Sequence, residues 1–387
     1  MRIGVITAIS SAYLVGIGLI QLLPVWVTDL EEHRGISGSG VGVLASLALL
    51  AAAVAAALTA PAASSPFRRP CAMAAAIIAG AALFTAAFTP PGLALTGLLI
   101  VAGGGTGVMA VIANACVAAT KDPSRAAAVM SMVAIVLVAL LTALLPLVPQ
   151  VDGAAAMTLA GLGLVFAAAG LACRWLPAPT AQPIATARTS SGRHSLIVKI
   201  LLISMLFSLS DVGAYAYAKD LGMHNGGYSS NGASIVLASS ILMSLAVAAA
   251  LSGFPLRRRS EKVLMAALAI NAVGKIGATL VGGQFGWAAS QFAWAIGTAG
   301  VIVVQLVYAA GRDSTGRLAA AVATGNSVGA ALGPGLAGVV MAHADGPGLA
   351  LMAGLAMAVT LLVGLLLPAV QADTRQAPGR LVATGDA

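Results

Sequence analysis

Apolar residues dominate the chain in long runs, and polar residues gather in the short segments between them. Each run is close to the ~20 residues that cross a bilayer as a helix. Their continuity excludes the alternating pattern of a membrane β-barrel. We expect twelve helices, at 5–27, 40–60, 71–89, 92–119, 126–148, 153–175, 196–218, 231–252, 263–282, 285–310, 317–341 and 348–370. The pattern therefore predicts an all-α polytopic membrane protein with twelve transmembrane helices.

The composition agrees with this prediction. Of 387 residues, 59% are hydrophobic and 8% are charged, and the mean hydropathy is +0.99. Soluble domains carry about a quarter charged residues. The apolar run near the N-terminus is longer than a signal-peptide core and no convincing cleavage site follows it, so we expect a retained first helix.

The net charge of +8 is distributed unevenly over the predicted loops. Lys and Arg concentrate in alternate loops, while the other loops hold Arg34 and Lys219. The first of these other loops also holds the acidic residues Asp29, Glu31 and Glu32. Cytoplasmic loops carry the excess of Lys and Arg. We therefore expect an integral inner-membrane protein of a bacterium with both termini in the cytoplasm. The basic residues set this orientation and do not indicate a nucleic-acid partner.

Cysteine and histidine patterns give no indication of a metal site or cofactor. The three cysteines lie in or beside predicted helices without a C-x-x-C spacing, and the four histidines lie outside the predicted spans. The sequence has no H-E-x-x-H motif, and its G-x-S-x-G match at 325–329 lies inside a predicted membrane helix, not at the strand-to-helix turn that a hydrolase would need. We expect no metal, no cofactor and no enzymatic activity, with a non-transporting sensor or membrane enzyme as the remote alternative.

An internal repeat divides the chain. Residues 44–58 (LASLALLAAAVAAAL) match residues 237–251 (LASSILMSLAVAAAL) at ten of fifteen positions, with an offset of 193. We expect two pseudo-symmetric six-helix bundles, at 1–176 and 196–370, with a cytoplasmic tail at 371–387. Residues 177–195 between them are rich in Pro, Ser and Thr, which is typical of a linker.

Two parallel six-helix halves with a cytoplasmic linker resemble the major facilitator superfamily of secondary transporters. The turn after the second helix keeps the basic pair of that family's loop motif, Arg68 and Arg69, without its glycines and acidic residue. Helix 317–341 contains GNSVGAALGPGLAG, which looks like the family's close-packed eleventh helix. Residues 23–47 are similar to the first outer loop and second helix of sugar- and drug-efflux members. The resemblance also implies a monomer.

The resemblance implies that helices 1, 4, 7 and 10 line a central cavity. Polar residues at helical spacing on these helices support this independently. The alternative is that such groups only bond between packed helices. The candidates for the cavity lining are Tyr13, Gln21, Asn114, Ser208, Gln291, Trp294, Thr298, Gln305, Tyr308 and Asn326.

Asp211 and Lys275 are the two oppositely charged residues predicted deep in the membrane. One account makes them a buried ion pair that neutralises two costly charges. The other makes Asp211 a cavity carboxylate that exchanges a proton or a cationic group, with Tyr215 one turn further on orienting it. Asp29 is a second candidate for a proton site, although its loop position favours an ordinary solvated charge.

Two basic clusters occupy equivalent cytoplasmic turns of the halves. Arg68 and Arg69 follow the second helix, and Arg257 and Arg258 follow the eighth. Setting the orientation of the chain in the membrane is sufficient to explain these residues. A more specific role is to close a cytoplasmic gate by pairing with acidic residues or with the carbonyl groups at helix C-termini.

The sequence thus predicts a secondary active transporter that moves a small organic solute through the lipid bilayer by alternating access. The solute partner is expected to be neutral, zwitterionic or cationic, and H⁺ is the expected coupling ion. Export is favoured by the resemblance to efflux members, with uptake or facilitated diffusion of a metabolite as the alternative.

Overall fold

The structure is a computed structural model that describes residues 3–120, 123–147, 157–177, 194–252, 260–312 and 317–367. Every regular element in these residues is a helix, which confirms the all-α prediction. Most of the predicted linker and the whole predicted tail lie outside the described residues. The division of the chain at 177–195 stays a prediction.

The helices follow the predicted apolar runs. The N-terminal half holds α1 (Ile3–Gln21), α2 (Leu23–Arg34), α3 (Gly38–Thr59), α4 (Arg68–Phe88), α5 (Leu93–Ala118), α6 (Pro123–Leu144) and α7 (Met157–Ala172), with 3₁₀ turns η1 (Ala62–Ser64), η2 (Leu145–Leu147) and η3 (Cys173–Trp175). The C-terminal half holds α8 (His194–Ala216), α9 (Ala218–His224), α10 (Ser230–Ser252), α11 (Ser260–Leu280), α12 (Gln284–Arg312) and α13 (Arg317–Leu365).

Eleven helices in the described part of the chain are long and apolar enough to span a membrane. One of them, α13, has 49 residues and would measure about 74 Å if straight, against about 30 Å for the hydrocarbon core. The backbone of Asp345 inside it is non-helical, with φ 47°. This break separates the eleventh and twelfth predicted helices, so α13 contains both.

The first helix of each half is interrupted. Pro24 has no N–H to donate to the preceding turn, so α1 ends at Gln21 and α2 begins after Leu22. Tyr217 separates α8 from α9 without a nearby proline. Leu22 and Tyr217 are 195 residues apart (217 − 22), close to the offset of the repeat. The two predicted helices at 5–27 and 196–218 are thus each broken at equivalent points.

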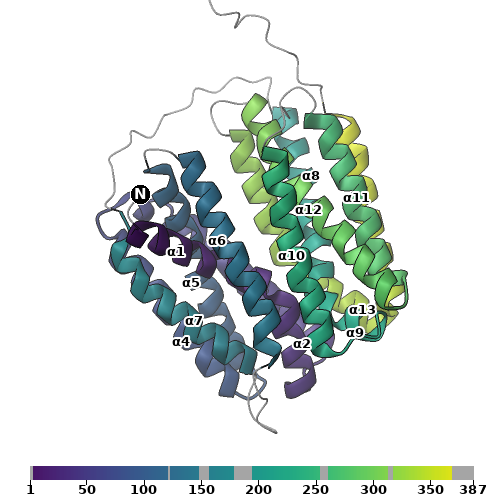
Figure 1. Ribbon diagram of the computed structural model, residues 1–387, viewed down its shortest axis with the longest axis horizontal. Helices are drawn as coiled ribbons and strands as arrows, with labels where there is room; N and C mark the ends of the chain where they lie inside the picture. The colour runs from purple at the N-terminus through teal and green to yellow at the C-terminus, as the bar shows by residue number, and fades with distance from the viewer. Residues whose placement is uncertain are drawn as a thin grey trace, which may run out of the picture.

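Helices of the two halves form two groups that meet where α2 and α9 lie and diverge toward the opposite end (Figure 1). We call the meeting point the α2–α9 end; the loop charges predict that it faces outward. Across it, α3 packs against α13 and α6 against α10. The Tyr217 hydroxyl donates to the Gly38 carbonyl at 2.8 Å, and the Gly335 N–H donates to Ser46 Oγ at 2.8 Å. These bonds join the halves at one end of the cavity.

Candidate functional site

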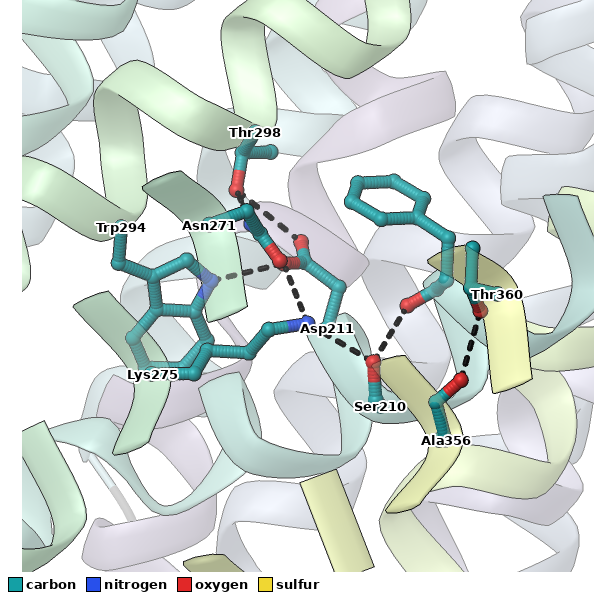
Figure 2. Close-up of polar contacts among 9 residues, drawn as sticks. Ser210, Asp211, Asn271, Lys275, Trp294, Thr298, Ala356 and Thr360 are labelled. Carbon is teal, nitrogen blue, oxygen red and sulfur yellow. Dashed lines mark hydrogen bonds and ion pairs between the residues drawn. The ribbon is translucent and has the colours of Figure 1, made fainter. Parts of the chain in front are cut away.

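Asp211 on α8 lies at the centre of a polar cluster that three helices of the second half assemble (Figure 2). Its Oδ1 accepts from Trp294 Nε1 at 2.7 Å, Asn271 Nδ2 at 2.9 Å and Thr298 Oγ1 at 3.2 Å, and lies 3.4 Å from Lys275 Nζ. Its Oδ2 has a single long contact, 3.5 Å from the same Thr298 hydroxyl. One oxygen is therefore saturated with donors, while the other is almost unused.

Lys275 on α11 lies behind Asp211 and is fully buried. Its Nζ donates to Ser210 Oγ at 2.8 Å and lies 5.4 Å from the centroid of the Phe207 ring. A buried ammonium group needs a counter-charge and hydrogen-bond acceptors, and Asp211 and Ser210 supply them. The ion pair that the sequence offered as one of two accounts is present.

Two glycines bring α11 close enough to α12 to build this cluster. A Cβ on Gly274 would overlap the backbone N of Trp294, and a Cβ on Gly297 would overlap the backbone N of Asn271. The backbones of α11 and α12 therefore touch directly. This close approach lets the Asn271 amide donate to the Thr298 hydroxyl at 2.9 Å as well as to Asp211.

A cavity of about 420 Å³ opens beside the cluster, and helices of both halves line it. Asp211 is the one charged residue that the described part of the chain contributes to its lining, and 14% of this side chain is exposed. The other lining residues are polar uncharged, aromatic and aliphatic. This size lies within the usual range of small-molecule sites, so the cavity can hold a small organic solute.

Most of the predicted lining residues lie at this cavity. Besides Asp211 and Tyr215, the structure brings together there Tyr13, Gln21, Ser208, Gln291, Trp294, Thr298 and Asn326. Gln305 and Tyr308 are buried in packing and offer no surface to a solute, so their prediction as lining residues is wrong. Asn114 is exposed but is not among the residues that line this cavity, and its role stays a prediction.

Several polar residues at the site were absent from the predicted set. Ser131 on α6 and Ser240 and Ser244 on α10 line the cavity, although these helices were not expected to. Asn271 is fully buried against Asp211. A signal for Asn271 existed in the sequence, because it lies one turn before Lys275 on the same face of a helix.

Tyr215 connects the two halves beside the site. Its hydroxyl donates to the Gln21 carbonyl at 3.0 Å, where α1 ends. Its ring meets the Trp294 ring edge-on, with centroids 6.1 Å apart. Both rings line the cavity. In this structure Tyr215 therefore bonds to the first half and shapes the cavity wall, and no hydrogen bond links its hydroxyl to Asp211.

The predicted gate residues are only partly described. Arg257 and Arg258 lie outside the described residues. Arg68 is almost fully buried and donates to the carbonyl of Pro177, and Arg69 Nε donates to the Leu176 carbonyl at 2.6 Å. These contacts hold the chain just after α7 within the first half. A gate role for the cluster stays a prediction.

Acidic residues of both halves meet at the α2–α9 end. Burial and the nearby negative charges of Asp220 on α9 and Glu32 on α2 raise the pKa of Glu31 to about 7, while His224 on α9 opposes this shift. Glu31 is therefore partly protonated near neutral pH when the two halves are in contact.

Asp29 is also part of this end, but in a different way. Its Oδ2 accepts the backbone N–H of Thr158 at 3.2 Å, and its Oδ1 lies 3.0 Å from His33 Nδ1. The side chain is 3% exposed, and burial raises its pKa. The expectation of an ordinary solvated charge is wrong, because the side chain folds inward onto the start of α7.

Comparison with known proteins shows which solved structures share this fold. No model of a known protein family matches the sequence, and no curated protein matches it. Solved structures do match over nearly the whole chain. A variant of the nucleoside transporter NupG has a TM-score of 0.74 at 15% identity, covering 93% of this chain and 98% of its own. A D-xylose-proton symporter gives 0.68 at 14% identity, covering 94% and 97%.

A third match is a bacterial homologue of the human lysosomal transporter Spinster, in an inward-facing and occupied conformation. Its TM-score is 0.68 at 14% identity, and the alignment covers 94% of each chain. At these identities the similarity establishes the fold, which is that of the transporters that the sequence resembled.

Proposed function

From the fold that this chain shares with major facilitator superfamily transporters, we propose that the protein is a secondary transporter that moves a small organic solute by alternating access. The observation that carries this proposal is the central cavity. Both halves line it, and the bonds of Tyr217 and Ser46 join the halves at one of its ends. Rocking the halves about such a cavity would expose it to one side of the membrane at a time.

Proton coupling is proposed at Asp211. Because Oδ1 is held by four donors, Oδ2 is the oxygen that a solute donor or a proton would take. Both ligands need the same lone pairs, so they compete for this atom. Competition at one carboxylate couples the outward movement of solute to the inward movement of protons when the proton gradient points inward.

Export is the proposed direction, and it rests on this competition together with the resemblance of residues 23–47 to efflux members. The second candidate is uptake or facilitated diffusion. It is favoured by the structural similarity to a D-xylose-proton symporter, since symport needs proton and solute bound together and not in competition.

The test is internal pH in liposomes that contain the purified protein, with sugars, polyols, amino acids and amines supplied one at a time. We expect at least one solute to trigger proton movement, and Asp211→Asn to reduce its rate at least tenfold. Asp345→Asn is the matched control, because Asp345 is exposed, lies outside the cavity and has a positive φ that Asn tolerates.

Unchanged proton movement in Asp211→Asn would remove the proposed coupling site. Solute flux without any pH change in the wild type would make the protein a facilitator or a carrier coupled to another ion. Retention of every solute gradient would contradict transport itself.

A further inference from the structure

The cavity offers a solute hydrogen-bond acceptors without a net charge. Among the described residues Asp211 is the one acidic or basic side chain in its lining, and Lys275 lies 3.4 Å behind it without reaching the cavity. The ammonium group offsets part of the attraction that the carboxylate exerts on a cation. A cationic solute would therefore gain less from Asp211 than from an isolated carboxylate, because it would also meet the field of the buried ammonium group.

Three oxygen acceptors in the described part of this lining lack a full set of donors. Gln291 Oε1 and Asn326 Oδ1 are buried without any hydrogen-bond partner, and they would meet a solute donor only when their cavity-lining side chains turn toward it. Asp211 Oδ2 has only its 3.5 Å contact with Thr298. Buried acceptors are costly to leave unpaired, so a solute that brings several O–H or N–H donors is favoured over one that brings acceptors.

The lining also excludes anions. The described residues of the lining include no Lys, Arg or His, so a carboxylate or phosphate group would enter without a counter-ion beside an existing carboxylate. The edge-to-face rings of Tyr215 and Trp294 give the solute an apolar wall. Polyhydroxylated rings and similar molecules combine an apolar face with several donors and suit such a wall.

We propose, on the basis of the transport function above, that the solute is an uncharged molecule with several hydroxyl or N–H donors, and that Lys275 determines this preference. Lys275 acts through Asp211 as a positioning and charge-compensating residue: it holds Oδ1 and leaves Oδ2 to the solute. Without Lys275, the cavity would carry an uncompensated negative charge and would select cations.

Binding to the purified full-length protein, measured by calorimetry, tests this directly. The probes are matched pairs in which one hydroxyl of a hexose, a pentose or a polyol is replaced by an ammonium group. We expect the wild type to bind the uncharged member of at least one pair about tenfold or more tightly than its ammonium partner. Lys275→Met should reverse this order, while Lys275→Arg should keep it.

Two further variants separate charge from folding. Asp211→Asn with Lys275→Met removes both charges, and we expect it to keep the preference for the uncharged member with weaker binding. Lys199→Met is the matched control, because Lys199 is partly exposed, lies outside the cavity lining and donates to the Leu366 carbonyl at 3.1 Å; its preference should equal that of the wild type. If Lys275→Met does not fold, a preference for ammonium in the double variant overturns the proposal.

The remaining outcomes distinguish this proposal from the transport function. Wild-type preference for the ammonium members, absence of binding by every uncharged probe, or an unchanged order in folded Lys275→Met would each overturn it. Movement of cations alone in liposomes would support the transport function and contradict the preference for uncharged solutes. Tight binding of uncharged probes without any flux would support the preference and contradict the transport function.

Discussion

The two oxygens of Asp211 have unequal partners because donors converge on one of them. Asn271 and Trp294 are uncharged donors that reach Oδ1 from two different helices, α11 and α12. Hydrogen bonds to a charged acceptor contribute about 1.5–3 kcal/mol each. Asn271 is fully buried and also fixes the Thr298 hydroxyl, so its main effect is to orient the carboxylate.

Asn271→Ala is expected to weaken solute binding about 5- to 30-fold, because the carboxylate and the Thr298 hydroxyl both lose a donor that fixes their direction. Calorimetric affinity for the best solute, measured beside thermal unfolding, checks this result. The control is Thr360→Val, since buried Thr360 bonds only to the Ala356 carbonyl of its own helix and lies outside the cavity lining. Equal losses of affinity in both variants would show that Asn271 acts only through general stability.

At the scale of elements, the site depends on how closely α11 and α12 approach. Glycine at 274 and 297 lets the two backbones touch, which is a common way for membrane helices to pack. The ninth predicted helix, now α11, was not among the helices that the resemblance placed at the cavity. Its close contact with α12 carries Asn271 and Lys275 inward to α8, so this helix supplies two of the residues that hold Asp211.

Gly297→Ala is expected to destabilise the protein and to disrupt the cluster, because its Cβ would overlap the backbone of α11 and neither helix has room to move. We expect a loss of about 1–3 kcal/mol, the usual cost of overpacking. Thermal unfolding in detergent and solute affinity are the measurements.

Gly97→Ala is its matched control. Gly97 lies in α5, and a Cβ there would meet nothing within 4 Å, so the substitution should be neutral or slightly stabilising. An equally stable Gly297→Ala would show that the contact between α11 and α12 is not tight.

At the scale of the whole molecule, closure of the α2–α9 end joins acidic groups of opposite halves. Glu31 on α2 faces Asp220 and His224 on α9, and Glu32 lies beside it on α2. When the halves separate, burial and the field of Asp220 are lost and the pKa of Glu31 returns toward its ordinary value of 4.5. Protonation of Glu31 therefore favours the closed end, because its pKa is higher there.

The protonation of Glu31 should thus stabilise the closed α2–α9 end fully below about pH 4.5. This stabilisation should be lost as the pH rises through about 7. Because Glu31 is partly exposed and solvent screens its charge, we expect the closed-to-open ratio to fall roughly tenfold between pH 5 and pH 8. Spin labels at Leu93 and Ser229, in a background without the native cysteines, report the distance across this end. Glu31→Gln should flatten the pH profile; an unchanged profile would contradict the assignment to Glu31.

The sequence alone determined the class of the fold and much of the cavity lining. Apolar runs of about 20 residues leave a helix as the solution that satisfies backbone polar groups in lipid, and the repeat with offset 193 predicted two similar halves. Polar side chains are expensive in a membrane, so those of helices 1, 7 and 10 marked the cavity. For the same reason Asp211 and Lys275 were singled out before any distance was known, with a buried ion pair and a cavity carboxylate as the two accounts.

Tertiary structure decided what depends on distances between helices. The polar residues Gln305 and Tyr308 share the helical face of Gln291 but are buried in packing, because periodicity gives the face of a helix and not the depth at which a neighbour covers it. The inequality of the two Asp211 oxygens arises from three helices meeting within hydrogen-bond range. No single helix encodes that arrangement, since the direction of each donor depends on where the other helices lie.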